Sequence, residues 1–281
     1  MSRIRELFTF SVERDDLEWE AVVEGQLCSY SNKKCYKVRK TQPDISIGTC
    51  TVQYGQDNKD LIICPHRLLE RKQIFTDCLH LLSSHQPGNE LHLVPEVAIP
   101  GGSVDFFLVS TDPNRKVKDF VGIELQALDT TGQVWPEREL ALRELGVEDN
   151  APKPSKSFGI NWKMTAKTIL VQLHHKVETF ESINKHLVLV VQDHLLDYIM
   201  QEFDFSSVNS QPLLGDSMHF HSYKLSKSGN NFKLVLDSRY STDSKGVAEL
   251  LGLKANPNLG FDEIAKLLEA KISDATIFSI A

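Results

Sequence analysis

The sequence lacks the features that mark several classes of protein. No stretch comes near the roughly 18 uncharged apolar residues that a membrane-spanning helix needs. The N-terminal stretch MSRIRELFTFSVERDDLEWE holds no apolar core of a secretion signal. We therefore expect a cytoplasmic protein with no membrane partner. Internal repeats and low-complexity tracts are also missing, which excludes solenoid architectures.

A net positive charge is absent as well, because 31 Lys and Arg stand against 38 Asp and Glu. Taken alone, this balance argues against a nucleic-acid partner. The basic residues are clustered, however: residues 28–40 hold five and residues 151–177 hold five lysines, with no acid in either run. Acids outnumber bases in residues 1–24 and 241–281. Each basic run fits either an ordinary solvated surface or a face that binds a polyanion.

Cysteine is sparse, and none of the five residues forms the tight C-x2-C knuckle of many zinc sites. Disulfides are not expected in a reducing cytosol. The spacing of Cys28, Cys35, Cys50 and Cys64 leaves two interpretations open, a structural metal site or buried thiols. A small polar segment has too little apolar core to fold unaided, and a bound metal can stabilise it. This favours the metal site. Cys78 lies inside an apolar pattern and is expected in the core.

Apolar periodicity predicts an α/β (α+β) fold. Strands are expected at 91–99, 103–110, 119–128, 186–191, 218–225 and 232–238. Helices are expected at 67–82, 136–145, 161–177, 244–252 and 262–272, and a proline-bearing loop at 149–157. The chain divides into a cysteine-containing segment 1–65, a core 66–205 and a C-terminal α/β extension 206–281 that packs on the core.

Acidic side chains interrupt the apolar strand patterns. Asp105 lies in one expected strand, and Glu124 with Gln126 lies in the next. Alternation puts Glu124 and Gln126 on one face, and a hairpin can bring Asp105 beside them. Two adjacent carboxylates need a cation, and hard oxygen ligands suit Mg²⁺. Glu96 on the preceding strand could complete the group, whereas the alternative is the solvated face of an antiparallel sheet.

The D, hairpin, E-x-Q pattern resembles the PD-(D/E)xK nuclease core. The ordered motifs C-x6-C, GTC, ICP-x-R, VDFFLV, VGIELQALDTTG and GINW are similar to the NotI and EagI group of type II restriction endonucleases, from about Cys28 to His175. The resemblance implies a central mixed sheet flanked by helices and catalytic residues Asp105, Glu124 and Gln126. It further implies a homodimer that cuts both strands of palindromic double-stranded DNA with Mg²⁺. Iron or zinc on the four cysteines, Cys28, Cys35, Cys50 and Cys64, is implied by the same resemblance.

Gln126 departs from the family pattern, where most members carry lysine. A neutral amide can orient water or bind metal through its oxygen, but it supplies no positive charge. Two alternative functions stay open: a nuclease of the same core in DNA repair or defence, and a non-catalytic, metal-stapled DNA-binding protein.

Phosphate contacts are expected from the second basic run. Its candidates are Lys153, Lys156, Asn161, Lys163 and Lys167, which span a loop and the start of a helix. The alternative is that this helix only buries its apolar side against the sheet and leaves its lysines in water.

Overall fold

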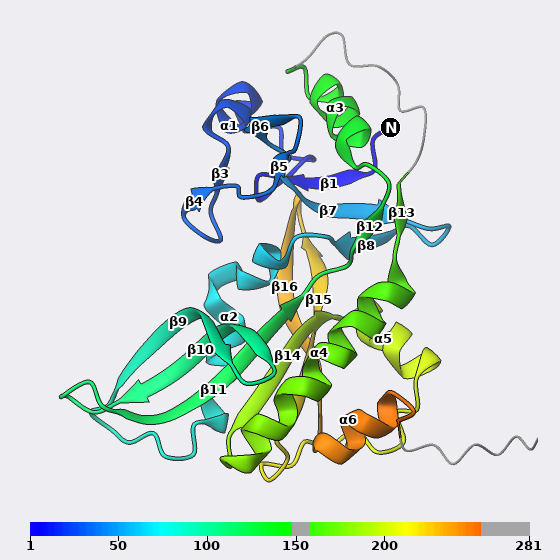
Figure 1. Ribbon diagram of the computed structural model, residues 1–281. Coiled ribbons are helices and arrows are strands. Elements are labelled where there is room, and N and C mark those ends of the chain that lie inside the picture. Colours follow the sequence, from blue (N-terminus) through cyan, green and yellow to red (C-terminus); the bar gives the residue numbers. More distant parts are fainter. Residues whose placement is uncertain (148–157, 254–281) are drawn as a thin grey trace, which may run out of the picture.

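The computed structural model describes residues 1–147 and 158–253. Its centre is a six-stranded mixed sheet with helices packed against it (Figure 1). The mixed α/β class expected from the sequence is therefore confirmed. In spatial order, the strands are β16 (Asn231–Thr242), β15 (Met218–Ser228), β14 (His186–Gln192), β11 (Val117–Gln126), β10 (Gly102–Thr111) and β9 (Glu90–Ile99).

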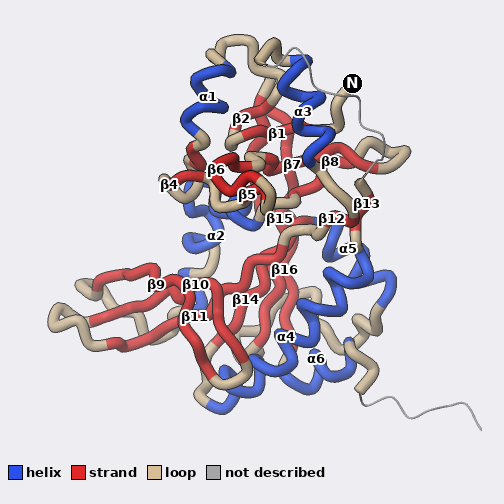
Figure 2. The backbone as a smooth tube through the Cα atoms, turned by 45° about the horizontal axis from the view of Figure 1, so that its top comes forward, coloured by secondary structure: helices blue, strands red, loops and turns tan. Residues whose placement is uncertain are grey.

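The sheet combines an antiparallel meander with parallel pairs. Strands β9, β10 and β11 run antiparallel, β14 lies parallel to both β11 and β15, and β16 returns antiparallel to β15. All six strands coincide with the apolar patterns found in the sequence. The meander extends outward from the rest of the molecule in both views (Figures 1 and 2).

Besides the single turn α2 (Gln73–Thr76), five α-helices accompany the sheets in the described part of the chain. They are α1 (Trp19–Gly25), α3 (Trp135–Glu144), α4 (Trp162–Ser182), α5 (Asp193–Glu202) and α6 (Ser244–Leu250). Helix α4 directly precedes β14 and buries an apolar stripe that includes Ile169, Leu173 and Phe180. The helices expected at 136–145 and 244–252 are confirmed as α3 and α6. The helix expected at 262–272 lies outside the described residues.

The continuous helix expected at 67–82 is wrong. The chain instead forms a kinked 3-10 segment (Pro65–Lys72), one turn of α-helix α2 (Gln73–Thr76) and a 3-10 turn (Leu79–Leu81). Arg71 and Lys72 have left-handed φ values of 52° and 55°, which interrupt the helix. The apolar spacing was real, because Leu68, Ile74 and Leu81 are buried, but Arg67 is buried with them.

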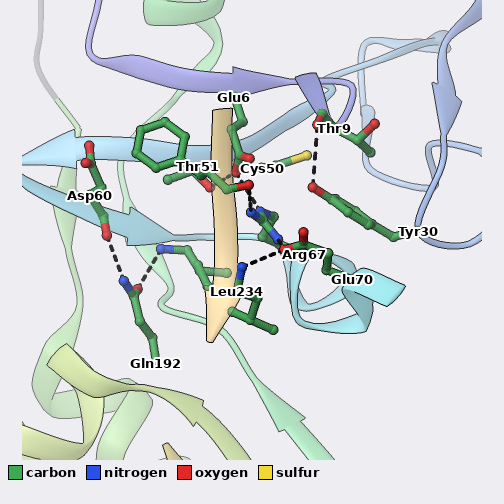
Figure 3. Close-up of polar contacts among 12 residues, drawn as sticks. Glu6, Thr9, Tyr30, Cys50, Thr51, Asp60, Arg67, Glu70, Gln192 and Leu234 are labelled. Carbon is green, nitrogen blue, oxygen red and sulfur yellow. Dashed lines mark hydrogen bonds and ion pairs between the residues drawn. The ribbon is translucent and has the colours of Figure 1, made fainter. Parts of the chain in front are cut away.

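A polar network around Arg67 fixes this kinked segment (Figure 3). The guanidinium pairs with Glu6 (Nε to Oε2, 2.7 Å) and Glu70 (Nη1 to Oε2, 2.7 Å). Glu70 also accepts a hydrogen bond from the backbone nitrogen of Leu234 on β16 (2.7 Å). The network therefore ties the N-terminus, the kinked segment and the edge of the central sheet together.

The N-terminal part forms a second, four-stranded sheet of order β2-β1-β7-β8 beside one end of the central sheet (Figure 2). Its strands are β1 (Ile4–Leu7), β2 (Phe10–Ser11), β7 (Thr49–Tyr54) and β8 (Lys59–Ile62). Three two-stranded ribbons are β3 (Leu27–Cys28) with β4 (Lys33–Lys34), β5 (Val38–Arg39) with β6 (Gln42–Ser46), and β12 (Thr130–Thr131) with β13 (Gly159–Ile160).

The three sequence segments share one core, and the second and third also share the central sheet. Ile4, Val52 and Leu61 of the N-terminal part pack in the same buried group as Leu170 of α4 and Leu189 of β14. Strands β15 and β16, from the third segment, complete the central sheet.

Candidate active site

The predicted acidic residues meet on the face of the central sheet that α4 covers. The β10–β11 register pairs Phe106 with Ile123, so that Asp105 lies opposite Glu124. A Cβ added at Gly122 would meet the Phe180 ring of α4 at 2.4 Å, which identifies the α4-facing side of β11. Glu124 points to this side by strand alternation. Gln126 follows on the same face.

Asp105 is held by the neighbouring strand. Its Oδ2 accepts a hydrogen bond from the backbone nitrogen of Leu125 at 2.8 Å. Burial raises the pKa of Asp105, and the nearby carboxylate of Glu96 raises it further, whereas Leu125 and Lys176 lower it. The sheet therefore orients the carboxyl group of Asp105. The nearby positive charge of Lys176 does not offset the rise in its pKa.

Glu124 is more deeply buried than Asp105 and has a cation beside it. Its Oε1 lies 2.6 Å from the Nζ of Lys176. Burial, together with the charge of Asp105, raises the pKa of Glu124 to about 7, although the hydrogen bond and charge of Lys176 oppose the rise. A carboxyl group whose charged form is disfavoured by burial and by one neighbouring acid is suited to binding a cation.

Lys176 is the residue that sequence reasoning missed. Its Nζ donates to the Ser103 carbonyl oxygen (2.5 Å) as well as to Glu124, and its side chain is 5% exposed. The signal was present in the helical spacing, because Lys176 follows Ile169 by seven residues and Leu173 by three, on the buried stripe of α4.

Glu96 and Gln126 occupy the margins of the group. The pairs Val104 with Val97 and Phe106 with Pro95 place Glu96 across from Asp105 on β9. Glu96 is exposed and has a left-handed φ of 52°. The Gln126 amide donates from Nε2 to the Ala127 carbonyl oxygen at 2.6 Å.

The donor set agrees with the ligands that Mg²⁺ takes in nucleotide-processing sites. Asp105 and Glu124 present two carboxylates side by side, and Mg²⁺ commonly uses one or two carboxylates while water and substrate phosphate complete its shell. Across the described ranges, no group of three or more His, Cys, Asp or Glu side chains is arranged to hold a metal by protein ligands alone. A site of two carboxylates needs no such cage.

The four predicted cysteine ligands lie near one another, but among the described residues they are not arranged as a group that could hold a metal ion. All are reduced, and Cys35 has its pKa raised by burial and further by the charges of Cys64 and Cys28. A hydrogen bond from Cys50, opposed by burial, lowers the pKa of Cys64 to about 6. Cys28 hydrogen-bonds His66, which the sequence had not suggested.

Cys78 lies apart from this group, as expected from its apolar surroundings. It is fully buried in the core on the other face of the sheet, where its Sγ lies 3.8 Å from Nδ1 of His221.

The predicted DNA-contacting residues are described only in part. Lys153 and Lys156 lie outside the described residues. Lys163 and Lys167 are exposed on α4 and form no ion pair within the described chain. Asn161 precedes the first turn of α4, and its backbone nitrogen donates to the Asp129 carbonyl oxygen at 2.8 Å. The helix buries one stripe and leaves these two lysines in water, and their contact with phosphate stays a prediction.

Among the described residues, no helix has the length and apolarity needed to cross a membrane. No protein-family model matches the chain, and comparison with proteins of curated function finds no match either.

Proposed function

We propose that this protein is a Mg²⁺-dependent endonuclease of double-stranded DNA with a PD-(D/E)xK-like active site formed by Asp105, Glu124 and Gln126. The observation that carries the proposal is the placement of Asp105 directly across from Glu124 on neighbouring strands, with a buried ammonium beside them. Such a pair of carboxylates, half enclosed between a sheet and a helix, is costly unless it binds something.

Each residue has a distinct task in the proposed site. Bound Mg²⁺ would lower the pKa of an attacking water and neutralise charge on the phosphate. Asp105, oriented by Leu125, and Glu124, oriented by Lys176, would hold that ion from two strands. Gln126 would orient the water through its amide, and Glu96 would add negative charge at the exposed edge.

The DNA would lie along the basic surfaces. Lys163 and Lys167 face solvent on the helix that covers the site, which supports phosphate contacts there. The resemblance to type II restriction endonucleases further suggests a homodimer that cuts both strands of a palindrome. A nuclease of repair or defence would share the chemistry but not the fixed cutting sites.

The cysteine group would hold one structural iron or zinc ion. Its support is that the four cysteines, Cys28, Cys35, Cys50 and Cys64, lie close enough to influence one another's pKa. Thiolates at neutral pH are the form that binds such metals, and the pKa of Cys64 at about 6 favours it.

Incubation of supercoiled plasmid with the purified protein and Mg²⁺ tests the proposed function. Discrete linear fragments are expected, whose ends define one sequence, and EDTA should prevent them. Asp105→Ala prepared in parallel excludes a contaminating nuclease. Intact plasmid under all divalent-metal conditions would reject the nuclease proposal, and a smear would favour an unspecific enzyme.

A further inference from the structure

The ammonium group of Lys176 is buried against strands β10 and β11, where burying a charge is energetically costly. Lys176 contacts Glu124 at 2.6 Å and the Ser103 carbonyl at 2.5 Å with 5% of its side chain exposed. Enclosing an ion pair is expensive, and packed apolar side chains often stabilise a protein as well or better. A helix that only covered the sheet would gain by an apolar residue at this position.

The β9–β10 turn is shaped to admit this lysine. A Cβ added at Gly101 would lie 2.1 Å from the His175 carbonyl oxygen, and one at Gly102 would lie 3.1 Å from Cε of Lys176. Both glycines have positive φ, 94° and 134°. Because these positions lack side chains, α4 approaches closely enough for its ammonium to reach β11.

The positive charge of Lys176 lies beside Glu124 on β11, where the Glu124-x-Gln126 motif itself supplies no cation. Gln126, two residues beyond Glu124 on the same face of β11, is neutral, and its amide is turned to the Ala127 carbonyl. Among the groups that meet Asp105 and Glu124 in the described structure, Lys176 is the cation.

We propose that Lys176 supplies from helix α4 the positive charge of this site and contacts the phosphate that is cleaved. The inference rests on the proposed nuclease function. In the reaction, a water oxygen bonds to phosphorus as the bond to the leaving sugar oxygen breaks. The water releases a proton to solvent, and the leaving oxygen takes one up. Lys176 keeps its proton, and its charge offsets the negative charge that develops on the phosphate oxygens.

The first measurement compares Lys176→Met with wild type. The cleavage rate at saturating DNA should fall about 100- to 1000-fold, the usual effect of removing one such donor. DNA affinity measured in Ca²⁺ should change little. Lys185→Met is the matched control, because Lys185 also pairs with a buried carboxylate of β11, Asp119 (2.7 Å), away from the site. It should lower stability but keep the cleavage rate.

A second variant that restores the positive charge from another position separates the effect of the Lys176 charge from the effect of its packing. In Lys176→Met combined with Gln126→Lys, the ammonium returns to the same face from β11, and at least a tenfold recovery of rate is expected. The double variant also restores a partner to Glu124, so it should fold even if Lys176→Met alone does not. Absence of folding or of recovery in the double variant would overturn the proposal, as would near wild-type cleavage by folded Lys176→Met.

Metal binding provides a readout independent of cleavage. An ammonium beside a divalent ion weakens its binding, so Lys176→Met should bind Mn²⁺ about fivefold more tightly than wild type. Gln126→Lys should reverse the gain. Weaker Mn²⁺ binding by Lys176→Met would mean that the lysine merely orients Glu124, and would reject the inference. If wild type binds Mn²⁺ but cuts no DNA, the nuclease proposal fails on its own, whatever the variants do.

Discussion

Asp105 and Glu124 are fixed by different partners, a backbone amide and an ammonium. Each is expected to be indispensable, because loss of either removes a carboxylate from a two-carboxylate site. Asp105→Ala and Glu124→Ala should each slow DNA cleavage by about a thousandfold or more. DNA binding should persist, since neither group contacts phosphate directly. Glu178→Ala, an exposed acid on α4, serves as control, and cleavage by either site variant within tenfold of wild type would remove that residue from the active site.

Arg67 offers a test at the scale of one buried side chain. Its guanidinium is 0% exposed and pairs with Glu6 and Glu70, so Arg67→Met would remove the closest cation from both carboxylates. We expect a loss of about 3–5 kcal/mol in the free energy of unfolding, measured by urea denaturation. Arg71→Met removes a guanidinium that is 72% exposed and should cost less than about 1 kcal/mol. Equal effects of the two substitutions would contradict this account of the network.

At the scale of elements, alternation and helical spacing were sufficient for the six strands of the central sheet and for α3, α4 and α6. They failed at 67–82, where the buried Leu68 and Phe75 keep a helical spacing of seven residues although the backbone turns at Arg71. The reason is a contact far away in sequence, between Arg67 and Glu6, which no local pattern reveals.

In the candidate site, too, local spacing predicts some residues, whereas another is brought in only by tertiary packing. Glu124 and Gln126 share a face because they are two residues apart, and a short hairpin brings Asp105 to them. Lys176 joins them only through the packing of α4 on the sheet, more than fifty residues along the chain. The sequence therefore revealed the carboxylates and missed their cation.

Helix α4 carries a prediction about where DNA binds. If Lys163 and Lys167 contact phosphates, replacing either by alanine should weaken binding to all sequences alike and lower the slope of log affinity against log salt by about one unit. Lys233→Ala on β16, another exposed lysine, should leave the slope unchanged. Unaltered slopes in both α4 variants would move the DNA to another surface, with residues 28–40 the next to test.

The cysteine segment makes a prediction about composition. Purified protein should contain one iron or zinc ion per chain, detected by elemental analysis, and Cys50→Ser should lose it and unfold more readily. Cys78→Ala should retain the metal, because Cys78 lies in the other part of the core. Metal-free protein that remains folded would instead identify the four cysteines as buried thiols.

For the whole molecule, acid should act through the histidines of β15. Burial, aided by the neighbouring His186, lowers the pKa of His219 to about 4, and its Nε2 lies 3.0 Å from the Asp216 carbonyl oxygen. Burial likewise lowers the pKa of His221. Both rings are therefore neutral in the folded protein at pH values where an unfolded chain binds protons.

The direction of the effect follows from linkage. Between about pH 6.5 and pH 4 the unfolded state binds more protons at position 219 than the native state, so stability falls as pH falls. Across this window His219 alone should cost about 3 kcal/mol, and above pH 6.5 it should cost nothing. Urea denaturation from pH 7.5 to pH 4.5 measures the effect. His219→Gln, which cannot take up the proton, should lose less stability over the same range than wild type. His175→Gln, at an exposed position on α4, should follow the wild-type curve. A His219→Gln curve parallel to wild type would show that acid destabilises the fold through other groups.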